Sequence, residues 1–349
     1  MSEYKIIAPV NKPSAAKVLM EVGADILYAG LKGWSLSPDN FEIGERDLIN
    51  IIKWAKEKNK EVYLTFNCLY RSSELREVIK LIETFHRRGA AGMILSDPGL
   101  IQTIRRQNPN LQIIASVQHS ASSSVDAEFL TDLGVNAVIL PRNKIDLSPK
   151  SVKAMKDKGI ELIVFAVADD STNYDGRCNL SAFLYQQVEN DPFGREKLYR
   201  GNINRSGYCH HPCMRVCSVG DKSDRFLKRG DLGVHRLVPQ LTKMGIDKFI
   251  IQGRELPPRL IANTIYAFRN LLDNLDDQEK FEKNCEVMDD LIELKQVISM
   301  GHLTLIEKSK SGFWQFVKNN FEKPLDERTT DLWFMSEGFK NWIKKVREV

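Results

Sequence analysis

The sequence predicts an α/β fold, a TIM-like (β/α)8 barrel with a long insertion and a helical extension at its carboxyl end. Three observations support this prediction. Apolar runs alternate with amphipathic helical segments along most of the 349 residues. A glycine separates the helical segment from the following apolar run in five places. Eight strand–helix units follow one another, the number that closes a barrel.

The predicted strands are short and apolar, as expected for a parallel sheet that is buried on both faces. Gly23, Gly89, Gly134, Gly159 and Gly245 each precede one of these strands and supply the left-handed residue that ends a helix. The strands are expected near residues 4–9, 25–30, 61–67, 91–96, 111–117, 136–141, 160–167 and 247–252.

The helices are predicted from apolar residues at three- and four-residue spacing. In Asp97-Pro98 and Ser148-Pro149, a capping residue precedes a proline at the first helical position. The expected helices are residues 13–22, 45–58, 75–88, 99–107, 125–133, 148–158, 234–244 and 257–272.

A doubly wound open sheet is the alternative arrangement of these elements. It is disfavoured because no Gly-x-Gly-x-x-Gly motif follows the first strand and because eight strands favour closure. The barrel domain is expected to comprise residues 1–275, with a cysteine-containing insertion at 168–232 after the seventh strand. Residues 276–349 are expected to form the helical extension, with helices at 285–298 and 313–321.

The composition is that of a soluble globular protein, with 42% hydrophobic and 28% charged residues. The amino terminus lacks the pattern of a signal peptide, and the longest apolar run, residues 162–168, is too short to span a bilayer. Six cysteines, mostly clustered, argue against a secreted disulfide scaffold. A cytoplasmic location without membrane insertion is therefore expected.

The insertion is locally basic, although the net charge of the chain is only +4. This charge fits either a solvated loop or a surface that attracts an anionic small molecule or RNA. The basic residues are Arg195, Lys197, Arg200, Arg205, Arg215, Lys222, Arg225, Lys228 and Arg229, against Glu196, Asp221 and Asp224.

Four cysteines lie in this insertion: Cys178, Cys209, Cys213 and Cys217. The last three recur every four residues, so they would share one side of a helical turn or lie in a tight loop. Such spacing is typical of metal or iron–sulfur ligands. It leaves open a 4Fe-4S cluster, a zinc site that includes His210 or His211, and free cysteines.

Barrel enzymes carry their catalytic groups at the carboxyl ends of the strands. The expected catalytic residues on this rim are Gln118, His119 and Tyr28, although His119 is equally suited to a structural hydrogen bond. Arg142, Arg254 and Asn67 are expected to bind substrate, because two arginines over a barrel mouth suit a carboxylate or phosphate. The other polar rim residues are Asn11, Cys68, Asp97, Asn143, Asp169, Asp170, Gln252 and Glu255.

A series of short motifs extends over about residues 5–272. The motifs are Ala8-Pro9, Gly23-Ala-Asp, Tyr28-x-Gly30, Asp97-Pro-Gly-Leu100, Ala115-Ser-Val-Gln118, Leu140-x-Arg142, Gly176-Arg-Cys-x-Leu-Ser181, Cys209-x-x-x-Cys213 and Gly253-Arg254. Together they resemble peptidase family U-32, the collagenase-like peptidases. The two cysteine motifs are the most specific part of the resemblance.

The resemblance implies a TIM-like barrel, in agreement with the strand count. The family also includes oxygen-independent ubiquinone-biosynthesis hydroxylation proteins and tRNA and rRNA hydroxylation proteins, and in the former, cysteines of this region hold a 4Fe-4S cluster. By this resemblance Cys178, Cys209 and Cys213 are expected cluster ligands. Cys217 is the preferred fourth ligand and Cys68 the alternative, while Cys285 is expected to be an inert buried thiol.

The chain departs from the family at two motifs. Where the family has Glu-x-Phe-x-x-Gly-x-x-Cys, the chain keeps only Phe165 and has Ile163, Ala168 and Ser171 at the other positions. The family's Glu-Gly-Arg after the last strand is Gln252-Gly-Arg254 here. These departures weaken a conventional peptidase assignment, because no Ser/His/Asp, Cys/His or His-Glu-x-x-His arrangement replaces the missing groups.

The expected function is therefore that of a 4Fe-4S-dependent enzyme, performing an oxygen-independent hydroxylation of a small anionic or RNA-linked substrate. A redox partner or a paralogous partner subunit would accompany it. A collagenase-like peptidase and a non-catalytic zinc- or RNA-binding accessory protein are the alternatives.

Overall fold

The structure is a computed structural model that describes residues 4–36, 42–142, 147–170, 174–177, 188–190, 196–198, 217–220, 222–224 and 231–303. The chain divides into two compact units. The first unit comprises Met1–Leu27, Phe165–Asp169 and Gly230–Val349, and the second comprises Tyr28–Val164 and Asp170–Arg229.

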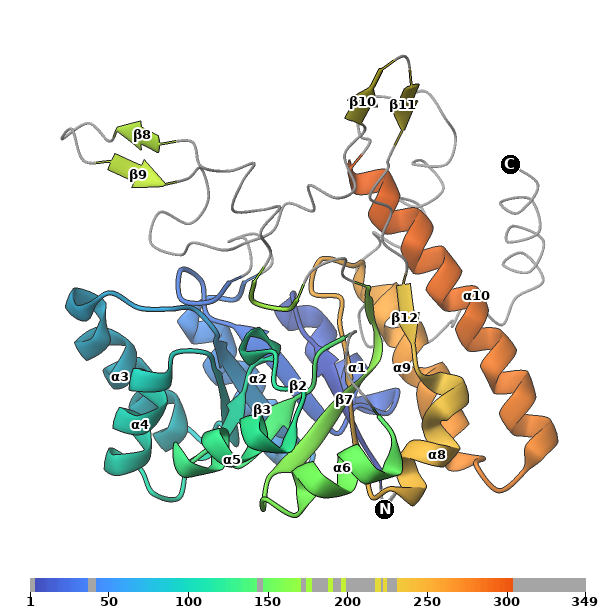
Figure 1. Ribbon diagram of the computed structural model, residues 1–349, viewed down its shortest axis with the longest axis horizontal. Coiled ribbons are helices and arrows are strands. Elements are labelled where there is room, and N and C mark those ends of the chain that lie inside the picture. The colour runs from blue at the N-terminus through green and yellow to red at the C-terminus, as the bar shows by residue number, and fades with distance from the viewer. Residues whose placement is uncertain are drawn as a thin grey trace. The chain divides into compact units, whose positions relative to one another are not determined.

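The main sheet of the described residues has the strand order β12-β7-β13-β1-β2-β3-β4-β5-β6, and an additional pairing of β7 with β6 closes it. Figure 1 labels β2, β3, β7 and β12 of this sheet. Its strands are β1 (Lys5–Pro9), β2 (Ile26–Gly30), β3 (Glu61–Phe66), β4 (Gly92–Leu95), β5 (Gln112–Ala115), β6 (Ala137–Ile139), β7 (Glu161–Asp169), β12 (Asp231–Gly233) and β13 (Lys248–Ile251). The predicted TIM-like barrel is confirmed.

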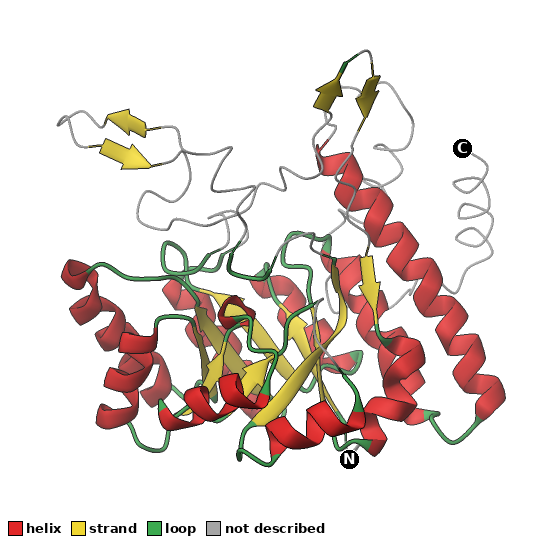
Figure 2. Ribbon diagram, in the orientation of Figure 1, coloured by secondary structure: helices red, strands yellow, loops and turns green. Residues whose placement is uncertain are grey.

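Helices follow the strands along the chain, as the secondary-structure colouring shows (Figure 2). They are η1 (Pro13–Ala15), α1 (Ala16–Glu21), α2 (Glu45–Glu57), α3 (Ser72–Arg87), α4 (Pro98–Gln107), η3 (Val117–His119), α5 (Ser124–Asp132), α6 (Pro149–Lys156), η5 (His235–Leu237), α8 (Val238–Lys243), α9 (Pro258–Asp273) and α10 (Gln278–Leu303). The five glycines predicted at helix ends all have positive φ, from 75° to 121°. No helix in the described ranges is both long and apolar enough to span a membrane.

In the second unit, β3, β4, β5, β6 and the first residues of β7 pair in parallel. The predicted caps are present: the Asp97 side chain accepts a hydrogen bond from the Leu100 amide at 2.9 Å, and the Ser148 side chain accepts one from the Ser151 amide at 3.4 Å. Helices α2, α3 and α4 bury apolar side chains such as Ile51, Ile82 and Ile101. Local sequence signals therefore account for this half of the barrel.

The seventh strand is longer than the predicted range of residues 160–167. β12 pairs antiparallel with its end, placing Asp231 opposite Asp169 and Gly233 opposite Val167. The predicted insertion at 168–232 therefore begins and ends inside this strand pair. Within it, β8 (Val188–Asn190) pairs with β9 (Glu196–Leu198), and β10 (Cys217–Val219) pairs with β11 (Lys222–Asp224).

In the first unit, β1 pairs in parallel with β13, with Ile6 opposite Phe249. Helix α10 packs against α9 and β12, and it contains the helix predicted at 285–298. The helix predicted at 313–321 lies outside the described residues. A domain boundary near residue 275 stays a prediction, and in the structure it falls between two helices that pack together.

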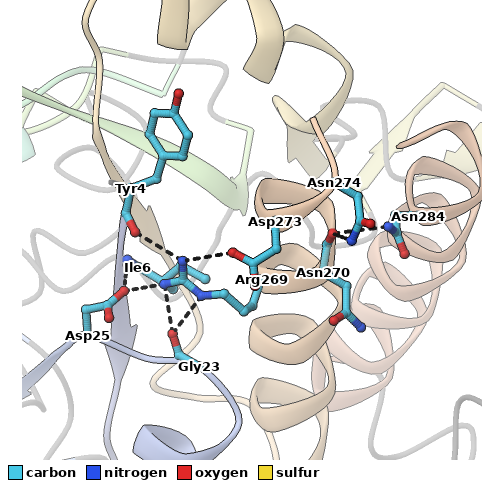
Figure 3. Close-up of polar contacts among 9 residues, drawn as sticks. All are labelled: Tyr4, Ile6, Gly23, Asp25, Arg269, Asn270, Asp273, Asn274 and Asn284. Atoms are coloured by element: carbon cyan, nitrogen blue, oxygen red, sulfur yellow. Dashed lines mark hydrogen bonds and ion pairs between the residues drawn. The ribbon is translucent and has the colours of Figure 1, made fainter. Parts of the chain in front are cut away.

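Arg269 of α9 holds the start of β1 beside the loop that precedes β2 (Figure 3). Its Nη1 donates to the Tyr4 carbonyl at 3.1 Å, and its Nη2 donates to the Gly23 carbonyl at 3.0 Å and pairs with Asp25. Asp25 also accepts a hydrogen bond from the Ile6 amide at 2.9 Å. This network lies where β1 begins, the end of a barrel strand at which residues contribute to stability rather than catalysis.

Candidate active site

The second unit brings several predicted rim residues to one edge of the sheet, because the carboxyl ends of parallel strands share an edge. Asn67 and Cys68 follow β3, Asp97 lies just after β4, and Gln118 and His119 lie in the turn η3 after β5. The Oδ1 atom of Asn67 accepts a hydrogen bond from the Leu36 amide at 3.1 Å, so it holds the loop after β2. Substrate binding by Asn67 stays a prediction.

Tyr28 lies inside the predicted strand of residues 25–30, not at its carboxyl end. It is the third residue of β2, and only 5% of it is exposed. Its phenol therefore belongs to a buried strand position, and a catalytic role for Tyr28 stays a prediction that this position does not favour.

His119 lies at the end of a tight turn. The Ser116 side chain accepts a hydrogen bond from the Gln118 amide at the start of this turn, and Ser120 at its end has a φ of 52°. A non-glycine residue in the left-handed region carries strain, which proteins retain most often at functional positions. The turn therefore holds the imidazole in a defined place at the carboxyl edge.

The pKa of His119 is lowered, chiefly because burial disfavours the imidazolium ion. A hydrogen bond to the Leu95 backbone and the charge of Asp97 oppose this shift but do not cancel it. The Nε2 atom is buried and has no hydrogen-bond partner among the described residues. Within the described residues the arrangement thus provides a neutral imidazole whose Nε2 is suited to accept a hydrogen bond or a proton.

Ser96, between β4 and Asp97, was missed by the sequence analysis. It is 8% exposed, and its Oγ atom, like His119 Nε2, has no partner in the described part of the chain. Asp97 itself has structural partners, since it caps α4 and its Oδ2 accepts a hydrogen bond from the Tyr70 amide at 3.2 Å. A serine after a strand carries no sequence signal that marks its hydroxyl as unpaired.

Arg142 follows β6 and is paired with Asp175. Its Nε donates to Asp175 Oδ1 at 2.8 Å, its Nη2 donates to the same oxygen, and its backbone amide donates to Oδ2 at 3.0 Å. The Asp175 side chain has no exposed area. The charge of Arg142 is thus already balanced within the protein, which does not favour the predicted substrate contact.

The neighbours of Asp175 also contact the rim. The Ser120 hydroxyl donates a hydrogen bond to the Asp175 carbonyl. Gly176 has a φ of 74°, and a Cβ atom there would lie 2.1 Å from the carbonyl oxygen of Gln118. Residues 174–177 therefore pack closely on the turn that carries His119, and only glycine allows this approach.

The first unit has a polar site of its own at the carboxyl ends of β7 and β13. Asp169, the last residue of β7, pairs with Lys295 of α10 and accepts a hydrogen bond from Gln252 Nε2 at 3.1 Å. Glu255 lies in the loop after β13, and its pKa is raised by burial and by the charge of Asp169. Asp169, Gln252 and Glu255 were expected on the rim, whereas Lys295 was missed.

A signal for Lys295 exists in the sequence. Buried positions on α10 recur at Phe281, Cys285, Met288 and Leu291, so Lys295 continues the apolar face of the helix. A lysine at such a position is seldom buried without a paired carboxylate. The pattern could have predicted a buried ion pair, but it could not have identified Asp169 as the partner.

Arg254 also lies after β13, in the first unit. The Asn11 side chain donates hydrogen bonds to the backbone carbonyls of Arg254 and Leu256, so it fixes the path of this loop. Arg254 and Arg142 belong to different units, and their predicted convergence on one anion stays a prediction.

The predicted cluster ligands are largely beyond what the structure describes. Cys178, Cys209 and Cys213, and the rim residue Asn143, lie outside the described residues. Cys217 is the first residue of β10, opposite Asp224, rather than part of a helical turn. No group of three potential metal ligands occurs within the described ranges.

Two further cysteines have described side chains. Cys68 is 2% exposed at the carboxyl edge of the second unit, where it stays the alternative fourth ligand. Cys285 is buried in α10, and burial raises its pKa to about 11. Because the thiolate is the form that binds metals, Cys285 is unsuited to that role, as predicted for an inert thiol.

Comparisons with known proteins give consistent matches. A sequence model described as peptidase family U32 matches residues 11–310. The tRNA hydroxylation protein P1 of Bacillus subtilis is 26% identical over 298 residues, which cover 82% of this chain and 67% of that protein. The tRNA hydroxylation protein P of Haemophilus influenzae is 29% identical over 323 residues, covering 80% and 70%. Among solved structures, the U32 peptidase Mk0906 matches with a TM-score of 0.46 and 14% identity, over 72% of this chain and 94% of that one.

Proposed function

The chain belongs to peptidase family U32, and from this premise we propose that it is an enzyme that hydroxylates a base in RNA. The observation that carries the proposal is the match to relatives named as tRNA hydroxylation proteins over at least 80% of this chain. The basic residues of the insertion support it, because attraction to the phosphate backbone supplies much of the affinity for RNA.

The carboxyl edge of the second unit provides groups that suit this reaction. A base must leave its stack to react, and its polar edge is then recognised by hydrogen bonds. The free Nε2 of His119 can accept a hydrogen bond from a base N–H, and the nearby Gln118 side chain offers both a donor and an acceptor. In this proposal His119 and Gln118 orient the base.

A 4Fe-4S cluster is the proposed cofactor, held by Cys178, Cys209, Cys213 and Cys217, with Cys68 as the alternative fourth ligand. The donor set fits, since four thiolates are the usual ligands of such a cluster. When bound, the cluster supplies one-electron redox chemistry. Zinc is the alternative occupant of the same thiolates. A redox or paralogous partner and a cytoplasmic location remain part of the proposal.

The activity is tested in host cells that lack their own U32 hydroxylation genes, because the cells supply the oxidant. RNA from cells that express the chain is digested, and its nucleosides are examined by mass spectrometry for the gain of one oxygen atom. We expect a hydroxylated nucleoside with wild type and about a hundredfold less with His119→Asn. His86→Asn is the matched control, because His86 lies in the last turn of α3, before β4 begins.

Two results would contradict the proposal. One is the absence of any hydroxylated nucleoside although the wild-type chain is soluble and abundant. The other is cleavage of gelatin by the pure protein that is lost in His119→Asn, which would favour the collagenase-like alternative.

The cofactor is tested separately, by iron and sulfide analysis after anaerobic purification. Cys213→Ala should lose most of the iron, whereas Cys285→Ala should keep it, because the Cys285 thiol is buried in α10. Colourless wild-type protein that contains zinc would exclude the cluster and leave the RNA proposal to the nucleoside analysis.

A further inference from the structure

The first unit holds a buried ion pair at the carboxyl end of β7. Asp169 is 1% exposed and Lys295 is 2% exposed, and the Nζ atom of Lys295 contacts Asp169 Oδ1. Desolvation of two charges is costly, so a pair of this kind is weak evidence for stability alone. Its position at the carboxyl end of a barrel strand is where these folds carry their chemistry.

Gln252 also contacts Asp169. Its Nε2 donates to Asp169 Oδ2 at 3.1 Å, and its Oε1 accepts a hydrogen bond from the Asp169 amide at 3.3 Å. Both oxygens of the Asp169 carboxylate therefore accept hydrogen bonds, one of them from a cation. These contacts favour the charged form of the carboxylate and fix its orientation.

Glu255 is the second carboxyl group of this site. Burial raises its pKa most and the negative charge of Asp169 raises it further, while Lys295 and Arg254 lower it less. Lys295 is already paired with Asp169, and the charge of Arg254 offsets the effect of burial only in part, so the neutral form of Glu255 is favoured. Glu255 as a whole residue is nevertheless partly exposed.

We infer that Glu255 and Asp169 form an acid–base site at the carboxyl ends of β13 and β7, in which Glu255 holds a transferable proton and Lys295 positions Asp169 as its charged partner. Two carboxyl groups whose surroundings favour opposite protonation states are the usual arrangement of an acid and a base. Neither the family match nor the relatives assign a role to these residues.

The ligand of this site would carry an oxygen that accepts a hydrogen bond, such as a ring carbonyl. In the proton transfer, the O–H bond of Glu255 breaks, a new O–H bond forms on the ligand, and Glu255 remains as a carboxylate. The reverse step restores the acid, so no oxidant or reductant is consumed. That the ligand belongs to an RNA rests on the proposed function.

The first experiment needs no RNA and measures thermal midpoints across a range of pH. Because the pKa of Glu255 is raised, its stabilising effect is complete below its usual value of 4.5 and is lost as the pH rises through the folded-state pKa. The Glu255→Gln variant has no proton to lose at this position, so it does not lose stability in this pH range. Its midpoint relative to wild type should therefore rise with pH across that window and stay constant outside it.

Glu286→Gln is the matched control, because Glu286 is an exposed carboxyl group on α10. Its midpoint relative to wild type should not show the rise seen with Glu255→Gln. A pH-independent difference for Glu255→Gln would overturn the inference.

The role of Lys295 is tested by two variants with opposite expected effects on the same window. Lys295→Met removes a positive charge and should move the pH range in which Glu255 loses its proton to higher pH. Asp169→Asn removes a negative charge and should move this range to lower pH. Each window is measured against the same variant combined with Glu255→Gln. If the Lys295→Met variant does not fold, the shift measured for Asp169→Asn alone tests whether the ion pair controls the titration of Glu255. Shifts in the same direction, or none, would show that the pair does not control Glu255.

The link to RNA is tested in the cellular assay with Glu255→Gln, which should lower the hydroxylated nucleoside by about a hundredfold. If the thermal midpoints show the expected pH dependence but wild type produces no hydroxylated nucleoside, the RNA proposal is contradicted and the acid–base site is not. Normal hydroxylation by Glu255→Gln would overturn the catalytic use of Glu255.

Discussion

Arg142 binds Asp175 through its guanidinium group and through its own backbone amide, with Nε–Oδ1 and N–Oδ2 distances of 2.8 and 3.0 Å. The two residues lie 33 positions apart, and Asp175 comes three residues before Cys178. The Arg142 side chain, which was expected to bind a substrate, therefore holds the segment at Asp175 that precedes Cys178. The rim of the second unit is built partly from residues that the sequence assigns to an insertion.

Asp175→Asn should lower the free energy of unfolding by about 3 kcal/mol, because it leaves the charge of Arg142 without its buried partner. Chemical denaturation measures this loss. Asp157→Asn is the control, since its pair with Lys153 is well exposed and should contribute less than about 1 kcal/mol. Equal losses in the two variants would show that the Arg142–Asp175 pair is not a structural anchor.

Gly176→Ala should destabilise the turn that carries His119. A Cβ atom at Gly176 would lie 2.1 Å from the Gln118 carbonyl, and backbone cannot move aside as a flexible side chain does. Gly159→Ala is the matched control, because Gly159 also has positive φ but nothing within 4 Å of its Cβ position. We expect the control to lose about 1–2 kcal/mol and Gly176→Ala clearly more, measured by denaturation. Similar losses would contradict the close packing of residues 174–177.

The lowered pKa of His119 predicts a pH effect on stability. The folded chain prefers the neutral imidazole, so this stabilising contribution is complete above the usual value of 6.5 and is lost as the pH falls through the lowered pKa. The His119→Gln variant has no imidazole to protonate, so it does not lose stability in this way. Its stability relative to wild type should therefore rise as the pH falls below 6.5. Thermal midpoints over this range, with His86→Gln as the control, measure the effect. A constant difference would show that His119 is not held neutral.

Cys285 should resist alkylation in the folded protein. Burial raises its pKa to about 11 from a usual value of 9.0, so at neutral pH its thiolate is about a hundredfold scarcer than that of an ordinary cysteine. Mass spectrometry of peptides after iodoacetamide treatment measures the rate, with unfolded protein as the control. Rapid modification of Cys285 in the folded chain would show that α10 does not cover this thiol.

Much of the barrel could be predicted because its signals are local. Five glycines at helix ends, the capping residues before Pro98 and Pro149, and the short apolar runs are each recognised from a few neighbouring residues. These signals locate the eight predicted strands of the barrel and place Gln118 and His119 after the fifth of them. The end of β7 was not predicted, because β12 extends it through pairing with residues distant in sequence.

The partners of charged residues could not be predicted in the same way. Lys295 and Asp169 are 126 positions apart, and either could have paired with many other residues. The sequence of α10 indicates that Lys295 lies on a buried face, but only packing brings it to the carboxyl end of β7. The same is true of Ser96 and His119, because only the fold shows that no described residue offers a hydrogen-bond partner to Ser96 Oγ or His119 Nε2.

The sequence by itself thus determined the barrel, the family and the residues that stand at the carboxyl ends of strands, because each depends on neighbours along the chain. Only the tertiary structure decided which of those side chains are buried or paired with other residues. In the folded chain Arg142 pairs with Asp175, Tyr28 is buried within β2, and Glu255 feels the charges of Asp169 and Lys295. Among the described residues, His119 Nε2 has no hydrogen-bond partner. The reason is physical: burial and charge pairing depend on distances in space, and these distances exist only in the folded chain.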